Sequence, residues 1–180
     1  MISYAISPIR QCRFHAVVTG LRCGLLLVTV LLGLLATGAR AQTASFSYAI
    51  ATLGGGFNLT GHVAVDGSDN VYVTDTNNSA IKEIPAGCTS ASCVMTLGGG
   101  FNHPSGVALD GSGNVYVADT YNNAIKEIPI GCVSSSCVTQ LAPDAYFNGP
   151  YGVAVDGSGN VYVAATFGGE VREIPVGCNS

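Results

Sequence analysis

The stretch Pro104–Ile125 reads PSGVALDGSGNVYVADTYNNAI, and it decides the fold because the chain contains versions of it three times. Its central hexapeptide, Val107–Ser112, occurs earlier as Val63–Ser68 and later as Val153–Ser158, each with one change, at offsets of 44 and 46 residues. A repeat of this length is one supersecondary unit that cannot bury its apolar faces alone. We therefore expect the repeats to stack on one another.

The middle copy contains four strand-like runs that are separated by turn sequences rich in Gly, Asn and Asp. The first two runs are apolar at nearly every position, which predicts that both of their faces are buried. The third run alternates between apolar and charged residues, as expected of a partly solvated strand near the outside of a sheet. The four predicted strands are Gly106–Leu109, Val115–Ala118, Ala124–Ile128 and Cys137–Leu141.

These runs predict an all-β fold, a partial β-propeller of about three four-stranded antiparallel blades. Phe46–Leu53 resembles a fourth strand without its first three, because Thr52–Asn58 is identical to Thr96–Asn102. The last repeat has only its first three strands, so its blade is either incomplete or completed by the N-terminal strand. Propellers have about four to eight blades, and we expect that two chains could form a homodimer with a six-bladed ring.

The N-terminal region, residues 1–41, has the pattern of a secretory signal peptide. Three arginines and no acidic residue precede the apolar run Gly24–Ala36, and Ala39-Arg40-Ala41 follows as a small-x-small cleavage site. An uncleaved membrane anchor is the alternative, although the run is short for a span of about 20 residues. Cleavage would leave residues 42–180 as an exported repeat domain, periplasmic or extracellular. The repeats are expected at about residues 54–97, 98–141 and 144–180.

The predicted mature chain is acidic. Its basic residues are Lys82, Lys126 and Arg172, whereas it holds all eleven acidic residues of the sequence. Nucleic-acid binding needs clustered basic side chains that replace phosphate counterions, and binding to anionic lipid has the same requirement. We therefore expect neither nucleic acid nor, after signal cleavage, a membrane as a partner.

Cysteine spacing agrees with export. Cys88 and Cys93 form a C-x4-C pair that returns as Cys132 and Cys137. In an oxidising compartment such local pairs are expected to form disulfides. Zinc binding is the alternative, but it requires two pairs that converge on one ion. Cys178 is a third copy of the first cysteine, whose partner would fall beyond the end of the sequence, so we expect it to be unpaired in a fragment or in one part of an oligomer.

The quoted stretch resembles an NHL repeat, and residues 61–81 and 149–171 resemble it more loosely. The resemblance implies a propeller of about six blades that serves mostly as a binding platform. Related propellers include gluconolactonase-like hydrolases, peptidyl-hydroxyglycine lyases and streptogramin lyases, so the resemblance implies the fold more firmly than the function. The third copy departs from the pattern, because Ala165 replaces the Asp of the motif V-A-D-T.

Two sets of aspartates recur with the repeat. Asp66, Asp110 and Asp156 precede Gly-Ser, which is typical of a hairpin turn that accepts backbone N–H groups. A calcium loop is the alternative, but the segment is too short for six ligands. Asp75 and Asp119 end the second strand of their repeats. A catalytic carboxylate would be expected once in the chain, whereas a structural turn is copied, so we interpret both as structural.

His62 and His103 are the histidines of the predicted mature chain, and they do not occupy equivalent positions. The counterpart of His62 is Gly106, and the counterpart of His103 is Leu59. Each histidine therefore breaks the repeat, in or beside the connection from a fourth strand to the next first strand. Such residues could bind a metal or transfer protons, or they are ordinary surface residues.

We predict a non-catalytic binding or scaffolding platform for a protein, peptide or glycan, with no catalytic residue, metal or cofactor. The alternative is a fragment of a propeller enzyme, a gluconolactonase-like hydrolase or a lyase, with a metal near a histidine. Aromatic and amide side chains suit a recognition surface, and the loops that carry Phe57 and Phe147 should emerge on the same face, although Phe57 and Phe101 could instead pack between blades. The predicted face consists of His62, Phe101, His103, Tyr121, Asn122, Asn123, Tyr146 and Tyr151.

Overall fold

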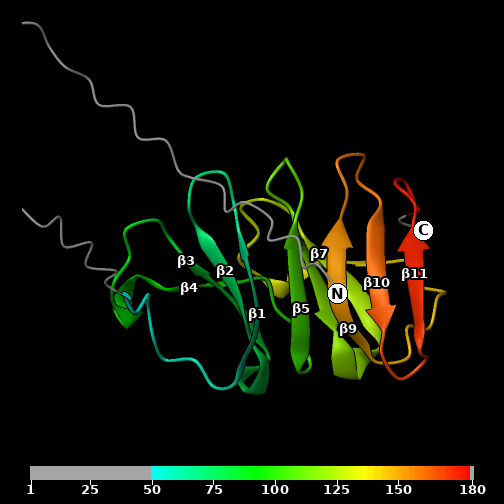
Figure 1. Ribbon diagram of the computed structural model, residues 1–180, viewed down its shortest axis with the longest axis horizontal. Helices are drawn as coiled ribbons and strands as arrows, with labels where there is room; N and C mark the ends of the chain where they lie inside the picture. Colours follow the sequence, from blue (N-terminus) through cyan, green and yellow to red (C-terminus); the bar gives the residue numbers. More distant parts are fainter. Residues whose placement is uncertain (1–49, 179–180) are drawn as a thin grey trace, which may run out of the picture. The chain divides into compact units, whose positions relative to one another are not determined.

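The computed structural model describes residues 50–178, which fold into three antiparallel β-sheets (Figure 1). The predicted signal peptide, residues 1–41, and the beginning of the predicted strand Phe46–Leu53 lie outside the described residues. Within the described part, no helix is long and apolar enough to cross a membrane. The architecture is a partial β-propeller, as the repeats predicted.

Each sheet takes its strands in chain order, so every connection within a sheet joins neighbours. The first sheet contains β1 (Thr60–Val65), β2 (Val71–Asp75), β3 (Ala80–Ile84) and β4 (Met95–Leu97). The second sheet contains β5 (Pro104–Leu109), β6 (Val115–Asp119), β7 (Ala124–Ile128) and β8 (Thr139–Leu141). The third sheet contains β9 (Pro150–Val155), β10 (Val161–Ala165) and β11 (Glu170–Ile174). The first strands β1, β5 and β9 lie side by side (Figure 1).

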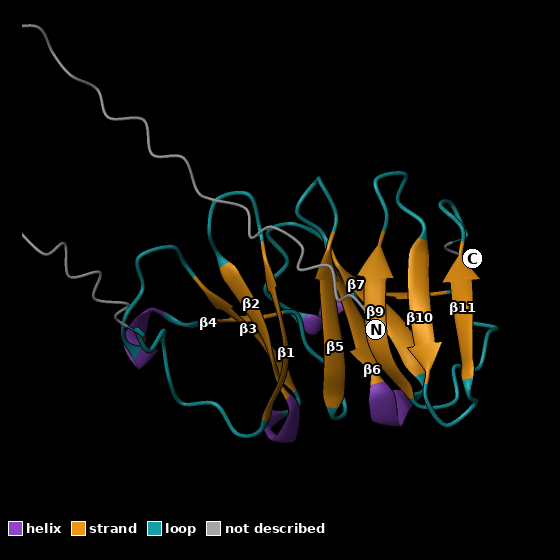
Figure 2. Ribbon diagram, viewed as in Figure 1, coloured by secondary structure: helices purple, strands orange, loops and turns teal. Residues whose placement is uncertain are grey.

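Short 3-10 turns are the helical segments of the described residues (Figure 2). Two of them follow second strands, η1 (Thr76–Asn78) and η3 (Thr120–Asn122), and the other two precede fourth strands, η2 (Ala91–Cys93) and η4 (Ser135–Cys137). The predicted fourth strand of the middle repeat is therefore shorter than expected, because Cys137 belongs to η4. The first strand of that repeat is longer, since it begins at Pro104.

The repeated Asp-Gly-Ser segments form the hairpin turns between first and second strands. In the second sheet, the backbone N–H groups of Ser112 and Asn114 each donate to Asp110 Oδ1 at 2.9 Å. Asn114 Nδ2 donates to Asp110 Oδ2, also at 2.9 Å, and Gly113 has φ +88°, which glycine adopts without strain. The same bonds recur in the other two sheets. The interpretation of these aspartates as turn residues is confirmed.

The core lies between neighbouring sheets. Ile81 and Val117 are fully buried between the first and second sheets, and Ile125 and Val163 are fully buried between the second and third. Burying one such side chain stabilises the fold by about 2 kcal/mol. The repeats therefore cover one another's apolar faces, as a stacked array requires.

The two end sheets differ from the middle one. Both faces of β5 and β6 are largely buried, as predicted, but β1 is mostly exposed, because no sheet covers its outer face in the described residues. The third sheet has three strands, so the last blade is incomplete here. Ile50–Leu53, the described part of the predicted N-terminal strand, has no strand assignment, and of the two predicted outcomes the described residues show the incomplete blade.

The predicted disulfides are present. Cys88 is bonded to Cys93, and Cys132 is bonded to Cys137, so each bridge closes the turn between the third and fourth strands of its sheet. Cys178 is unpaired and exposed. Disulfides are typical of proteins from oxidising compartments, and these two are compatible with an exported chain.

Candidate ligand-binding face

Two kinds of connection meet at one end of the sheets, the end at which β1, β5 and β9 begin. The N–H of Tyr121, in the turn after β6, donates to the carbonyl of Asn102, in the connection from β4 to β5, at 3.1 Å. The first sheet has the same contact, from Asn77 N–H to the Asn58 carbonyl at 3.1 Å. The 3-10 turns η1 and η3 follow the second strands and lie at this end, in purple at the lower end of the sheets in Figure 2. The repeat thus builds a face from fourth-to-first and second-to-third connections.

Buried aspartates hold these connections together. Asp119 Oδ1 accepts from Asn102 N–H at 2.7 Å, and its Oδ2 accepts from Asn122 Nδ2 and the Lys126 ammonium, each also at 2.7 Å. Asp75 accepts from Asn58 N–H in the first sheet. Both carboxylates are fully buried, with 0% of the residue exposed. The prediction that these two aspartates are structural is confirmed.

The third sheet lacks this aspartate. Ala165 occupies the position and is fully buried, and a turn replaces the 3-10 segment of the other sheets. Arg172, the counterpart of Lys126, forms an exposed ion pair with Glu170 instead (Nε to Oε1, 2.7 Å). The change that the sequence shows at Ala165 therefore alters the turn, as expected.

His103 and Tyr121 form a stacked pair on the face. Their ring centroids are 4.4 Å apart and their planes make an angle of 22°. His103 has φ +49°, in the left-handed region, and its backbone N–H donates to Ser79 Oγ at 3.4 Å. The connection from β4 to β5 thereby places the imidazole against a phenol ring that is 61% exposed.

His62 and Tyr151 form a second pair, from the first strands of the first and third sheets. Their rings meet edge to face, with centroids 5.7 Å apart. His62 Nδ1 lies 2.5 Å from the carbonyl oxygen of Ser105, which belongs to the strand between them. Half of Tyr151 remains exposed. The three sheets therefore bring both predicted histidines and two predicted tyrosines to one region.

Three of these four side chains, all except His62, line a hollow with a volume of about 420 Å³. His103, Tyr121 and Tyr151 line it, together with hydroxyl and amide groups of Thr60, Thr76, Asn77, Ser105 and Thr120. Aromatic walls with a few polar groups are typical of ligand sites. The arrangement could hold a ligand that stacks on a ring and exchanges hydrogen bonds with neutral side chains.

The other predicted face residues lie elsewhere. Phe101 is 7% exposed and belongs to the core between the first and second sheets, with Lys126 Nζ 5.4 Å from its ring centroid. Phe147 is 2% exposed in the next core cluster. The expectation that these two rings emerge on the face is wrong, because the connections turn them inward to fill the space between sheets. The half-buried Phe57 packs against a core cluster of the first sheet.

Of the remaining predicted face residues, Asn122 and Asn123 hold the turns together, and Tyr146 lies outside the hollow. Asn122 donates to Asp119, and Asn123 Oδ1 accepts from Gly149 N–H at 2.9 Å. Tyr146 is 64% exposed, but it does not line the hollow. These residues are therefore not brought into the group around His103.

The sequence reasoning missed the polar lining of the hollow. Ser105 could have been found, because Gly61 and Tyr151 replace it in the other copies. Thr76 and Thr120 could not, since they belong to the repeated pattern and carry no signal of their own. Asn77 is the counterpart of Tyr121 in the first repeat, at a turn position that differs among the three copies, so it could also have been found.

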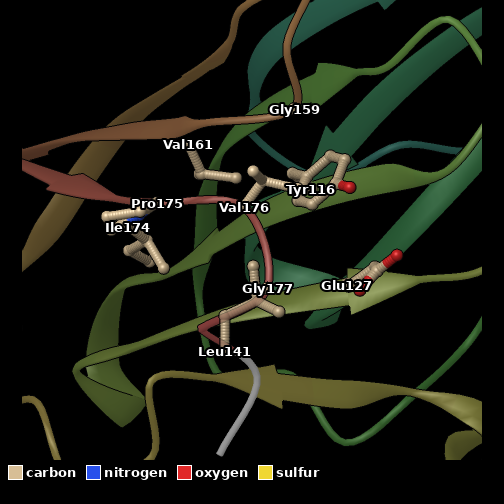
Figure 3. Close-up of a pocket in the computed structure, with 9 residues that line it drawn as sticks. All are labelled: Tyr116, Glu127, Leu141, Gly159, Val161, Ile174, Pro175, Val176 and Gly177. Carbon is tan, nitrogen blue, oxygen red and sulfur yellow. The ribbon is translucent and has the colours of Figure 1, made fainter.

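A second kind of hollow recurs between the opposite ends of neighbouring sheets. Figure 3 shows the one between the second and third sheets, which is lined by Tyr116, Glu127 and Val176 among others and has a volume of about 80 Å³. Its counterpart between the first and second sheets contains Tyr72 and Glu83. Because the same residue types recur in both, we interpret these hollows as parts of the blade architecture.

The carboxylates beside these hollows have shifted pKa values. Burial, followed by the charge of Asp110, raises the pKa of Glu127. Burial also tends to raise the pKa of Asp110, but hydrogen bonds from Asn114 and Ser112 outweigh it and lower the value. Burial and then the Glu127 charge raise the pKa of Tyr116 to about 12, and burial and the Glu83 charge raise the pKa of Tyr72 to about 12.

The tyrosine shifts predict a loss of stability in alkali. An unfolded tyrosine has a pKa near 10, so each raised value favours the folded, protonated form below pH ~10 and loses this effect as the pH rises to ~12. We expect the melting temperature to fall between pH ~10 and ~12, and the double variant Tyr72→Phe, Tyr116→Phe to fall less. Calorimetry across this range tests it, with Tyr146→Phe as the control. An equal fall in the double variant would contradict the prediction.

Within residues 50–178, no group of three or more His, Cys, Asp or Glu side chains is placed to hold a metal ion. His62 and His103 each have aromatic neighbours instead.

Comparison with known proteins identifies the repeat. The family model described as NHL repeat matches residues 101–128, which run from Phe101 through β5, β6 and β7. No curated protein matches the sequence. The matched segment includes Asp110 and Asp119, the two turn aspartates of the second sheet.

Solved structures resemble the fold at low sequence identity. Hydrazine synthase of Kuenenia stuttgartiensis is 12% identical, with 74% of this chain and 36% of that chain covered, at a TM-score of 0.56. A protein of unknown function from Bacteroides thetaiotaomicron is 20% identical, with 65% and 37% covered, at a TM-score of 0.50. Virginiamycin B lyase from Staphylococcus aureus is 16% identical, with 66% and 41% covered, at a TM-score of 0.48.

This chain spans about two fifths of the length of the solved structures that it resembles. At such identities the similarity shows the fold alone. The three sheets in chain order and the matched repeat lead to one assignment. The chain contains an NHL repeat at residues 101–128, and its described residues have the fold of a partial β-propeller.

Proposed function

We propose that this chain is an exported, non-catalytic NHL-repeat protein that binds a protein, peptide or glycan on the face around His103 and Tyr121. The observation that carries the proposal is that the aromatic residues His103 and Tyr121, which line the hollow, stand at positions where the repeat is broken. His103 replaces Leu59 and Gly149 of the other copies, and Tyr121 replaces Asn77 and Phe167. A scaffold position should recur in every blade, whereas a position adapted to one ligand should not.

The chemistry of the hollow supports a neutral, partly apolar ligand. The rings of His103, Tyr121 and Tyr151 offer flat surfaces, and tyrosine supplies contact area at a low cost in side-chain entropy. The polar groups around them are hydroxyls and an amide. Sugar rings and short peptides both combine apolar faces with hydrogen-bonding groups, which is why we propose these classes.

Two features support export. The chain forms two disulfides in local loops, as expected in an oxidising compartment. The predicted signal peptide at residues 1–41 agrees with this, although it lies outside the described residues. We propose that the chain acts in the periplasm or outside the cell.

The proposal is tested by probing the purified chain against a glycan array and a library of short peptides. A ligand found in this way should bind at least ~10-fold more weakly to Tyr121→Ala, because losing one buried aromatic contact costs about 1.4 kcal/mol or more. His103→Asn should weaken binding similarly, and asparagine tolerates the left-handed backbone of this position. Tyr146→Ala is the matched control, since it removes an exposed tyrosine outside the hollow.

Equal affinity of all three variants would contradict the binding site. Turnover of a lactone or of a cyclic peptide ester by the purified chain, abolished in His103→Asn, would contradict the non-catalytic part of the proposal. That second outcome would instead favour a fragment of a propeller enzyme.

A further inference from the structure

Among residues 50–178, nothing covers the outer face of the third sheet, which repeats an interface that the chain forms twice between its sheets. Ile81 on β3 and Ile125 on β7 are both 0% exposed, because the next sheet packs on them. Val171 on β11 occupies the same repeat position and is 75% exposed. Exposed apolar surface of this kind marks an interaction site.

The outer face of the first sheet is the other half of the same interface. Val107 on β5 is 7% exposed where it meets the first sheet, whereas its counterpart Val63 on β1 is 64% exposed. Val65 on the same strand is 57% exposed. The chain thus presents the two complementary halves of its own sheet-to-sheet contact at its two ends.

The hydrogen bonds across the interface are also repeated. Thr76 Oγ1 donates to the carbonyl of Pro104 in the next sheet at 2.8 Å, and Thr120 Oγ1 donates to the carbonyl of Pro150 at 2.8 Å. Thr166 is the equivalent residue of the third sheet and is exposed. The carbonyl equivalent to that of Pro104 is that of Thr60, at the start of β1.

The segment before β1, residues 54–59, has the same backbone conformation as the connection that leads from the outer strand β4 to β5. The connection 98–103 runs from β4 to β5 with positive φ at Gly98 (+58°), Gly100 (+76°) and His103 (+49°). The connection 54–59 has positive φ at the three equivalent positions, +63°, +80° and +56°. Asp75 binds Asn58 N–H at 2.7 Å, as Asp119 binds Asn102 N–H. Residues 51–53 therefore lead into the first sheet as β4 leads into the second.

We propose that a second copy of this chain covers both open faces, so that two chains close one six-bladed ring. The third sheet of each copy packs on the first sheet of the other. Residues 51–53 of each copy add to β11 of the other as the missing fourth strand. Head-to-tail contacts form a closed ring when the rotation closes, and six is the multiple of three within the range of about four to eight blades.

The register of the added strand follows from the complete sheets. Ile81 pairs with Leu97, and Lys82 pairs with Thr96. By the repeat, Val171 should face Leu53 of the second copy, and Arg172 should face Thr52 of the second copy. The apolar pair would then be buried, as Ile81 and Leu97 are.

A substitution at Gly152 distinguishes a ring of two chains from a single chain. A Cβ on Gly106 would lie 2.5 Å from the Tyr151 carbonyl oxygen of the next sheet, whereas a Cβ on Gly152 would meet only Ala164 Cβ, at an ordinary 3.5 Å. In the ring, β1 of the second copy would lie against Gly152. Gly152→Ala should therefore leave each chain folded and block the contact between copies.

The experiment measures the mass in solution of the full chain, exported and purified, by light scattering from micromolar concentrations upward. We expect twice the mass of one chain for the wild type and a dissociation constant at least ~100-fold weaker for Gly152→Ala. Gly111→Ala is the matched control, because a Cβ there meets open space, and it should keep the double mass. Unchanged circular dichroism should show that both variants are folded.

A cross-link tests the register directly. In a Cys178→Ser background, Thr52→Cys combined with Arg172→Cys should give a covalent dimer under mild oxidation. Thr52→Cys combined with Lys82→Cys should not, because β4 already occupies the edge of β3. A wild type of single mass at all concentrations overturns the proposal. So do assemblies that grow without closing, or a Gly152→Ala variant that keeps the double mass.

Discussion

Replacing Gly106 by alanine should lower the free energy of unfolding by about 3 kcal/mol, at the upper end of what overpacking usually costs. The new Cβ would lie 2.5 Å from the Tyr151 carbonyl oxygen, 3.1 Å from Val153 N and 3.2 Å from Ala118 Cβ. The first two atoms are backbone of β9, so relief requires the third sheet to move away from the second. The contact between the two sheets would then weaken along the whole length of β5 and β9.

The first sheet shows what a side chain at this position does. His62 is the counterpart of Gly106, and the pairing of β1 with β2 is irregular between Thr60 and Val63. The pairing of β5 with β6 is also irregular, between Pro104 and Gly106, but there Gly106 itself pairs with Ala118. The glycine therefore allows β5 to stay paired and to approach β9 at the same time.

Denaturant unfolding at a concentration where the chain keeps one oligomeric state measures this effect. Gly111→Ala is the control, because it makes the same chemical change in open space within a turn and should shift the midpoint little. A Gly106→Ala variant as stable as Gly111→Ala would show that the sheets are not in close contact at this point.

Asp119→Asn is the second change expected to have a large effect, and it should destabilise the chain by about 3 kcal/mol. The substitution keeps the size of the side chain but removes the charge that pairs with Lys126 at 2.7 Å. The carboxylate is fully buried and the lysine side chain is 15% exposed. The amide therefore leaves a poorly solvated ammonium without its anionic partner, although it still donates to the Gly100 carbonyl at 2.6 Å. Breaking a buried pair by changing one member typically costs ~3–5 kcal/mol, and partial exposure of the lysine places this pair at the low end.

Asp75→Asn is the matched control in the first sheet. Asp75 accepts from Asn58 N–H and from Asn78 Nδ2, as Asp119 does from its own neighbours. Lys82, however, donates to Thr96 Oγ1 and not to the carboxylate. The control should therefore cost about 1–2 kcal/mol, the usual effect of disturbed hydrogen bonds to a charged group. The difference between the stability losses of the two variants in thermal unfolding measures the contribution of the ion pair. Equal losses would show that the ion pair contributes little to stability.

Much of the fold could be predicted from the sequence, because the evidence for it is local and copied. The hairpin at Asp110, the disulfide between Cys132 and Cys137 and the strands of the middle repeat each depend on residues within a few positions of one another. Comparing three copies separates residues that the blade needs from residues that vary. This comparison also singled out His62 and His103, whereas Tyr121 and Tyr151 were predicted as aromatic residues of the loops.

The candidate site could be predicted only in part, because it depends on how neighbouring sheets meet. Phe101 and Tyr121 looked alike as loop aromatics, yet one fills the core and the other stacks on His103 in the open. The direction of a loop side chain follows from the packing of the whole connection, and no periodicity records it. The polar residues Thr76 and Thr120 were missed for the same reason, since only the arrangement of the sheets brings them to the hollow.

The sequence by itself determined that this protein is an array of antiparallel blades, with its turns, its bridges and the positions where the repeat is broken, because each of these depends on neighbours along the chain. The tertiary structure alone decided that His103, Tyr121 and Tyr151 line one hollow and that, in the described residues, β1 and β11 carry uncovered halves of a shared interface. These features join residues about 45 positions apart, and that separation is bridged only when the sheets pack side by side.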